Sequence, residues 1–237
     1  VLTSADLPYA MAPGVEPRFN YEPASNWEGE DMFTWYVDDG GEAPDGGTSP
    51  LAYVDITVTT GPQAVHVFTM DTDPGWTGEG EWAWGEPQGQ GGQYGNPDPN
   101  SGATGAHVVG YNLAGDYANN LPEYAVTTGA LDCSQMTDTE LRFMRWLNVE
   151  TSTYDHASIR VSNDNGTTWT QIWENSSSVE DSSWNAMSYD ISDLADGSDA
   201  VRIQWIMGTT DSSWQFSGWN LDDVELWGIL PSSNLPG

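Results

Sequence analysis

Four aspartates have the residue type and spacing to bind a hard cation. Asp71 and Asp73 follow one predicted strand, and Asp222 and Asp223 begin another near the C-terminus. The first and last strands of a two-sheet β-sandwich are commonly neighbours, so the two pairs can meet at one end. Four carboxylates repel one another strongly unless a cation lies among them. Ca²⁺ takes about six to eight oxygen ligands from carboxylates and carbonyls. We therefore predict Ca²⁺ here; the alternative is a solvated acidic strand end.

The strand that carries Asp222 and Asp223 determines which way the two carboxylates point. Successive side chains of a strand alternate between faces, so Asp222 is expected on the side of Val224 and Leu226. Asp223 is expected on the opposite side with Leu221. A carboxylate in line with apolar core positions is costly to bury unless a cation or several donors meet it.

A second, weaker cation site is predicted in the loop that contains Asn96, Asp98 and Asn100. Oxygen-bearing side chains recur there at every second position, as in part of a calcium-binding loop. The downstream glutamate that an EF-hand requires is missing at the right spacing. A structured turn is an equal alternative.

Exposed aromatic rings would serve to bind a glycan, because the faces of Trp and Tyr stack on sugar rings. The chain has 13 Trp and 10 Tyr, more than one core needs. The alternative is that most of these rings fill the core or support loops. The predicted ligand-binding residues are Trp76, Trp82, Trp84, Tyr94 and Tyr117.

The patterns typical of catalysis are missing from the sequence. His66, His107 and His156 lie on separate predicted strands, without the spacing of a HExxH metal motif. No GxSxG nucleophile motif occurs. Cys133 is expected to be a small buried residue rather than a nucleophile. We therefore predict that the chain is not an enzyme.

The chain is strongly acidic, with a net charge of −31 from 36 acidic residues, five arginines and no lysine. This balance argues against nucleic acid and anionic membranes as partners, because both require basic patches. It is typical of a protein in a salty or calcium-containing medium, so we predict an extracellular or cell-surface location. The single cysteine excludes an internal disulfide. No apolar stretch is long enough for insertion into a membrane.

Short strands separated by turn-forming segments follow one another through the central part of the chain. No helical pattern of comparable strength occurs, and a two-sheet arrangement accounts for the alternation. We therefore predict an all-β fold, a two-sheet jelly-roll β-sandwich. The strands are expected at residues 65–70, 81–84, 107–112, 123–128, 140–149, 155–162, 168–173, 184–191, 200–207 and 217–228.

Residues 64–228 resemble the cleaved-adhesin modules of gingipains, which are relatives of MAM-type and carbohydrate-binding jelly rolls. The ordered motifs that carry the resemblance are Asp71-Thr72-Asp73, Gly75-Trp76, Leu141-Arg142-Phe143, Ile159-Arg160-Val161-Ser162 and Trp219-Asn220-Leu221-Asp222-Asp223. The resemblance implies a non-catalytic binding or adhesion domain with one or more structural calcium ions. It does not identify a ligand.

The N-terminal segment contains two predicted strands, 31–37 and 51–58, joined by a loop rich in Gly, Asp and Pro. The segment resembles the C-terminal half of bacterial cadherin-like, immunoglobulin-like repeats. Its matching motifs are Tyr21-Glu22-Pro23, Asn26-Trp27, Phe33-Thr34-Trp35 and Asp39-Gly40-Gly41. The resemblance implies an N-terminal partial Ig-like β segment without its first strands. We consider three explanations: a fragment of a longer protein, packing on the following domain, or completion by strands of another chain.

Three regions are therefore predicted: an Ig-like part at 1–61, a jelly-roll binding domain at 62–228 and a Pro/Ser-rich linker tail at 229–237. We predict a non-catalytic extracellular adhesion or ligand-binding module, stabilised by calcium, from a larger secreted multidomain bacterial protein. Its partners would be a glycan or an extracellular protein surface. The alternative is a structural subunit of an extracellular filament or surface layer, joined to neighbouring copies by β-strand exchange through the N-terminal segment.

Overall fold

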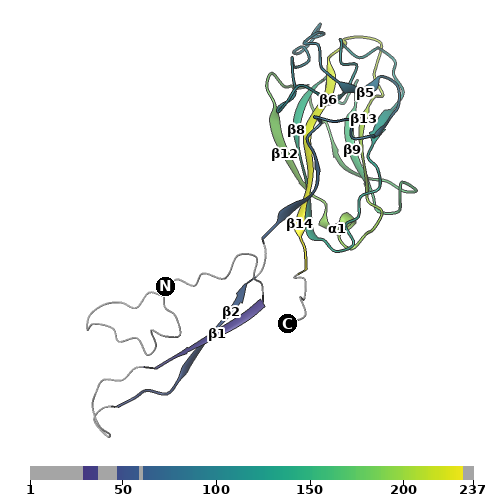
Figure 1. Ribbon diagram of the computed structural model, residues 1–237. Helices are drawn as coiled ribbons and strands as arrows, with labels where there is room; N and C mark the ends of the chain where they lie inside the picture. The colour runs from purple at the N-terminus through teal and green to yellow at the C-terminus, as the bar shows by residue number, and fades with distance from the viewer. Residues whose placement is uncertain (1–28, 37–46, 59–60, 232–237) are drawn as a thin grey trace. The chain divides into compact units, whose positions relative to one another are not determined.

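The computed structural model describes residues 29–36, 47–58 and 61–231, which belong to two compact units (Figure 1). One unit comprises residues 1–60 with 232–237, and the other comprises residues 61–231. The motifs at residues 21–27 and 39–41, and most of the predicted linker tail, lie outside the described residues. The cadherin-like resemblance therefore stays a prediction.

The described part of the first unit is a single antiparallel hairpin. Strands β1 (Gly29–Trp35) and β2 (Ala52–Val58) pair in a continuous register from Gly29 opposite Val58 to Trp35 opposite Ala52. These strands correspond to the two expected from the sequence. The hairpin exposes large apolar side chains, namely Met32, Phe33, Trp35, Tyr36, Leu51 and Tyr53.

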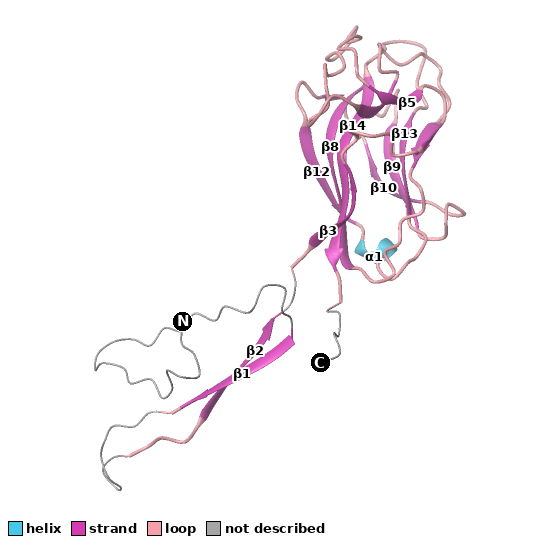
Figure 2. Ribbon diagram, in the orientation of Figure 1, coloured by secondary structure: helices cyan, strands magenta, loops and turns pink. Residues whose placement is uncertain are grey.

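The second unit is a sandwich of two antiparallel β-sheets, which Figures 1 and 2 show as two facing layers. The larger sheet has the order β11-β8-β14-β6-β5, with β12 also paired to β8 and β3 to β14. Its strands are β3 (Gln63–Phe68), β5 (Trp82–Gly85), β6 (Val108–Tyr111), β8 (Thr137–Val149), β11 (Val179–Glu180), β12 (Asn185–Asp190) and β14 (Gly218–Ile229).

The smaller sheet has the order β10-β9-β13-β7-β4. Its strands are β4 (Thr77–Gly78), β7 (Tyr124–Thr127), β9 (Ala157–Ser162), β10 (Thr170–Glu174) and β13 (Arg202–Met207). One short helix, α1 (Ser192–Ala195), follows β12. The all-β, two-sheet sandwich expected from the sequence is thus confirmed. Among the described residues, no helix is both long enough and apolar enough to span a membrane.

The core lies between the two sheets because alternate residues of each strand point inward. Phe143 of β8 and Trp205 of β13 meet edge to face across it, with ring centroids 5.6 Å apart. Trp205 also stacks on Trp76, at 5.3 Å and an interplanar angle of 9°. Cys133 is buried, as predicted, and burial raises the pKa of its thiol to about 12, so it is an inert core residue at neutral pH.

A β-bulge in β14 reverses the alternation of its side chains. The pairing of β14 with β8 shifts between Asp222 and Glu225, and Asp223 has a φ of 45°, in the left-handed region. The extra residue of a bulge moves all later side chains to the opposite face. The prediction that Asp222 shares a side with Val224 and Leu226 was therefore wrong. The residues of β14 in the core are Trp219, Leu221, Val224 and Leu226.

Candidate functional site

The loop between β5 and β6 is tied to Asp222 and Asp223, two of the four predicted calcium ligands. The backbone N–H of Thr104 donates to Asp222 Oδ2 at 3.0 Å, and the Thr104 hydroxyl donates to Asp223 Oδ1 at 2.8 Å. Asp222 also accepts from the backbone N–H of Asp223 at 2.8 Å. Asp222 is fully buried, and burial raises the pKa of its carboxyl to about 6. Two backbone donors thus meet a carboxylate that burial destabilises.

Gly102 faces a concentration of oxygen atoms beside Asp222. A Cβ atom at this position would lie 2.2 Å from the carbonyl oxygen of Thr104, 2.6 Å from Asp222 Oδ2 and 2.9 Å from the carbonyl oxygen of His107. Only glycine fits this space. Carboxylate and carbonyl oxygens are the donors that Ca²⁺ prefers. Among the described residues, however, no three of the four predicted aspartates have carboxylate oxygens within 4.8 Å of one another.

Asp71 reaches the same loop, whereas Asp73 closes a turn of its own. A Cβ atom on Gly105, whose φ is 57°, would lie 2.2 Å from Asp71 Oδ1. Asp73 Oδ1 accepts from the backbone N–H of Gly75 at 2.8 Å. The structure therefore brings Asp71 into contact with the loop that holds Asp222. Asp73 serves a local turn.

The three residues of the weaker predicted site have separate partners. The backbone N–H of Asn96 donates to Asn148 Oδ1 at 2.8 Å, and Asn100 Oδ1 lies against Gly89. Asp98 is almost fully buried, and its Oδ1 accepts from Asn220 Nδ2 at 2.7 Å. Burial raises the pKa of Asp98 to about 8. These contacts attach the loop to the outer face of the larger sheet, and they do not bring the three side chains together.

Three of the five predicted aromatic ligand residues line one pocket. Trp76, Trp82 and Trp84 surround a space of about 150 Å³, together with Asp73. The remaining lining residues are Pro74, Gly78, Ala83, Val109 and Val126. The pocket lies where the edge strands β4 and β5 of the two sheets meet. It combines indole rings with a carboxylate.

Contacts with neighbouring residues fix the positions of two of these indole rings. Trp84 stacks on His107, with centroids 4.5 Å apart and rings 9° from parallel, and its Nε1 donates to the carbonyl oxygen of Met70 at 2.8 Å. Trp76 stacks on the core residue Trp205. The Trp76 Nε1 is buried and has no hydrogen-bond partner among the residues that the structure describes.

Trp82 and Tyr117 are both largely buried, so neither ring is an exposed platform, although Trp82 contributes to the lining of the pocket. Trp82 is 7% exposed, and its Nε1 donates to the carbonyl oxygen of Tyr124 at 3.0 Å. Tyr117 is 0% exposed, and its hydroxyl donates to Asp155 Oδ2 at 2.5 Å. Both rings belong to the buried core cluster of the sandwich.

Tyr94 is paired with an exposed tryptophan that the sequence prediction missed. Trp214 stacks on Tyr94 at 4.9 Å and 13°, and 53% of Trp214 is exposed. Trp214 has a φ of 52°, in the left-handed region that only turns normally require. The available signal was the repeated Asp-Ser-Ser-Trp sequence at 181–184 and 211–214, which indicates a turn but not an exposed ring.

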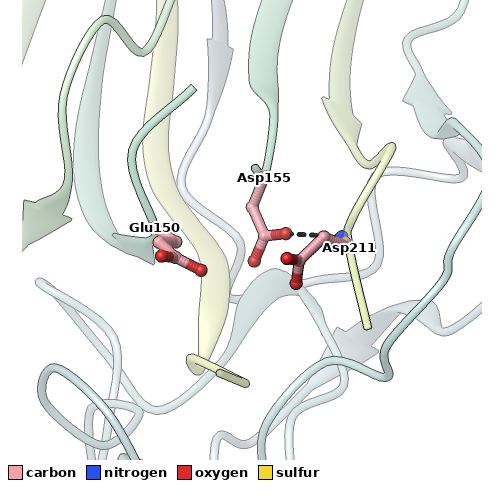
Figure 3. Close-up of side chains that lie close together, drawn as sticks. All are labelled: Glu150, Asp155 and Asp211. Carbon is pink, nitrogen blue, oxygen red and sulfur yellow. Dashed lines mark hydrogen bonds between the residues drawn. The ribbon is translucent and has the colours of Figure 1, made fainter. Parts of the chain in front are cut away.

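A cluster of three carboxylates lies at the end of the sandwich (Figure 3). One carboxylate oxygen each from Glu150, Asp155 and Asp211 lies within 4.8 Å of the other two. This is the only such group of acidic, histidine or cysteine side chains in the described part of the chain. The backbone N–H of Asp211 donates to Asp155 Oδ1 at 2.8 Å. Glu150 and Asp155 lie in the connection from β8 to β9, and Asp211 lies after β13, so the meeting of all three depends on the tertiary fold. The cluster has the geometry to hold a metal ion.

The histidines do not form a common centre among the described residues. His156 Nδ1 lies 2.9 Å from Glu174 Oε1, and His107 stacks on Trp84. The third, His66, makes a contact of 2.9 Å to a backbone carbonyl oxygen, that of Asp132. Each imidazole therefore has a separate structural partner.

No family model matches the chain. Bacillopeptidase F of Bacillus subtilis (strain 168) is 28% identical over 183 residues, which are 73% of this chain and 11% of that protein. The chain thus spans only a small part of the length of the curated relative that it matches. The similarity therefore covers one region of the relative, and the activity of the whole relative is not carried over to this chain.

Solved structures similar to the chain include the CBM22-1 xylan-binding domain from Paenibacillus barcinonensis Xyn10C. It is 9% identical, with a TM-score of 0.44, over 73% of this chain and 99% of that domain. The K3 cleaved adhesin domain of Lys-gingipain from Porphyromonas gingivalis W83 is 16% identical, with a TM-score of 0.39, over 69% of this chain and 98% of that domain. The structural neighbours are therefore carbohydrate-binding and cleaved adhesin domains, the class that the sequence resemblance named.

Proposed function

We propose that residues 61–231 form a non-catalytic glycan-binding module of a larger extracellular bacterial protein. The observation that carries the proposal is the pocket in which Trp76, Trp82 and Trp84 meet Asp73. Indole rings offer apolar surface to the C–H face of a sugar, and a carboxylate accepts hydrogen bonds from its hydroxyl groups. The volume of about 150 Å³ is small beside the roughly 300–1,000 Å³ of a drug-sized site. A single sugar ring or chain end suits it.

A neutral glycan fits the charge of the chain better than an acidic one. The net charge is −31, and a polyanion would be repelled. Each described arginine also has its own polar partner: Arg142 binds Glu140, Arg145 binds Asp181, Arg160 binds Glu123 and Arg202 binds Asn165. Neutral polysaccharides are therefore the appropriate probes.

A bulky substitution at an exposed residue of the pocket lining tests the role of the pocket. Ala83 lines the pocket on β5, so Ala83→Phe should occupy the space without removing a core side chain. We expect binding to insoluble xylan, cellulose or chitin to fall at least tenfold, with an unchanged unfolding temperature. Ala186→Phe, at an exposed alanine of β12 outside the pocket lining, is the matched control. Equal binding by both variants would reject the pocket, and no binding by the native chain to any of these polymers would reject the glycan.

We also infer a structural Ca²⁺ ion at the predicted first site. Asp222, Asp71 and the carbonyl oxygens of Thr104 and His107 support it through their contacts with the same loop. Such an ion would neutralise the buried Asp222 carboxylate and join the segment after β3 to the loop before β6 and to β14. The role of these residues is to hold three segments together and not to carry out a reaction.

A second candidate function, assembly through the N-terminal hairpin, is favoured by one observation. Strands β1 and β2 expose Met32, Trp35 and Tyr53 at 55%, 47% and 61%. A two-stranded hairpin is marginally stable in water, so a covering surface is expected, which strands of a neighbouring copy could supply. Light scattering should then show oligomers that dissociate in the Trp35→Lys variant. A monomer at all concentrations would exclude this function.

A further inference from the structure

The carboxylates of Glu150, Asp155 and Asp211 form a second acidic site, which is built differently from the one at Asp222. Glu150 follows β8 directly, Asp155 precedes β9, and Asp211 lies in the connection from β13 to β14 (Figure 3). Glu150 is 6% exposed and Asp155 is 0% exposed. Burying carboxylates this close together costs several kcal/mol unless a positive charge compensates them.

The hydrogen bonds within the cluster satisfy only part of it. Both oxygens of Asp155 have donors, namely the backbone N–H of Asp211 at 2.8 Å and the hydroxyl of Tyr117 at 2.5 Å. Glu150 Oε2 is buried and has no hydrogen-bond partner among the residues that the structure describes. Figure 3 shows the Glu150 carboxylate directed toward the other two. A buried carboxylate that has an unpartnered oxygen and faces two further carboxylates lacks a positive partner.

No arginine of the described residues supplies that partner, and His156 interacts electrostatically with Asp155 alone of the three carboxylates. The four described arginines are bonded to Glu140, Asp181, Glu123 and Asn165, and the imidazole of His156 is directed to Glu174. Repulsion from Asp155 and Asp211 adds to burial in raising the pKa of Glu150. The compensating charge must therefore come from a bound ion or from a proton.

We propose that Glu150, Asp155 and Asp211 bind a hard divalent cation, Ca²⁺, at a site separate from the one at Asp222. The donor atoms are all oxygens, without a thiolate or imidazole, and such sets prefer Ca²⁺ over Zn²⁺. Asn119 Oδ1 is a candidate further ligand. It is buried without a partner among the described residues, and its Nδ2 donates to the carbonyl oxygen of Ser212, next to Asp211. The remaining positions are available to water.

The cation would join the segment between β8 and β9 to the segment between β13 and β14. The second of these segments carries Trp214, which is stacked on Tyr94 in the long loop after β5. The ion would thereby hold three connections at one end of the sandwich in a fixed arrangement. We therefore expect the ion to affect the stacked pair of Tyr94 and Trp214, and not the tryptophan pocket at β4 and β5.

The test compares Glu150→Gln with the native chain after removal of metal by chelation. Isothermal titration with Ca²⁺ should show one bound ion fewer per chain in Glu150→Gln. Terbium luminescence excited through aromatic residues should fall, because Tyr117 touches Asp155. Glu123→Gln, which removes an exposed carboxylate that pairs with Arg160, should leave both readings unchanged. In the chelated state Glu150→Gln should melt no lower than the native chain, because it loses a buried, unpartnered charge.

Three results would overturn the proposal. The same number of Ca²⁺ ions in Glu150→Gln and in the native chain would show that a proton compensates the cluster. A lower melting temperature of Glu150→Gln in chelator would show a structural contact of Glu150 instead. Tighter binding of Zn²⁺ than of Ca²⁺ at the lost site would reject the hard cation. An Asp222→Asn variant that keeps the Glu150-dependent ion would show that the two sites are independent.

Discussion

The hydroxyl of Tyr117 lies 2.5 Å from Asp155 Oδ2 and joins the closed core to the acidic cluster. Burial raises the pKa of both groups, so the phenol keeps its proton and donates it. Tyr117→Phe leaves Asp155 Oδ2 buried without this donor. We expect a loss of about 1–3 kcal/mol in the free energy of unfolding, measured by urea denaturation.

Tyr111→Phe is the matched control for this loss. The Tyr111 hydroxyl is also buried but has no hydrogen-bond partner among the described residues. Its removal should change the free energy of unfolding by less than about 0.5 kcal/mol, because no bond is broken. Equal losses in the two variants would show that the Tyr117 hydroxyl contributes packing alone.

Removal of calcium should lower stability through Asp222. EGTA is expected to lower the unfolding temperature of the native chain by several degrees, because a ligand of the folded state is lost. Asp222→Asn should show a smaller shift, since it removes the buried carboxylate that meets Thr104. Differential scanning calorimetry with and without EGTA measures both. An identical EGTA shift in the native chain and in Asp222→Asn would contradict a calcium site at this residue.

The alternation of apolar and polar residues predicted the strands, because each strand of a sandwich has one face in the core and one face toward solvent. Ile203 and Trp205 on β13 alternate with Arg202 and Gln204, and this pattern is visible without coordinates. The side of Asp222 could not be predicted, because a bulge is a backbone event that leaves no periodic signal.

Contacts between distant segments were equally hidden in the sequence. Glu150 and Asp211 meet only because β8 and β13 end at the same end of the sandwich. The sequence predicted a loop that contains Asn96, Asp98 and Asn100. The hydrogen bond between Asp98 and Asn220, which holds this loop against the larger sheet, depends on the tertiary fold. The sequence alone could not predict it.

The turn between β9 and β10 should depend on pH through Asp164. Its carboxylate accepts from the backbone N–H and the hydroxyl of Thr168 and from the hydroxyl of Ser162, and these donors lower its pKa to about 2. A lowered pKa stabilises the folded state above the ordinary value near 3.8, and this contribution is lost as the pH falls toward 2. Asp164→Ala should therefore be less stable than the native chain at pH 7, and the difference should disappear as the pH falls below 2.

An NMR titration of Asp164 gives the direct measurement. Thr168→Val removes the hydroxyl donor and keeps the backbone donor, so it should raise the pKa of Asp164 only partly toward its ordinary value. A native pKa near 3.8 would show that these donors do not favour the carboxylate.

The ion pair of Arg145 and Asp181 should contribute far more to stability than the pair of Arg160 and Glu123. Asp181 accepts from Arg145 Nε at 2.9 Å and from the backbone N–H of Leu147 at 3.0 Å, and both side chains of the pair are nearly buried. Asp181→Asn leaves the Arg145 charge buried without its partner, which costs about 3–5 kcal/mol. Glu123 is about half exposed, so Glu123→Gln should cost no more than about 1 kcal/mol. Urea denaturation compares the two, and equal losses would mean that water reaches the Asp181 pair.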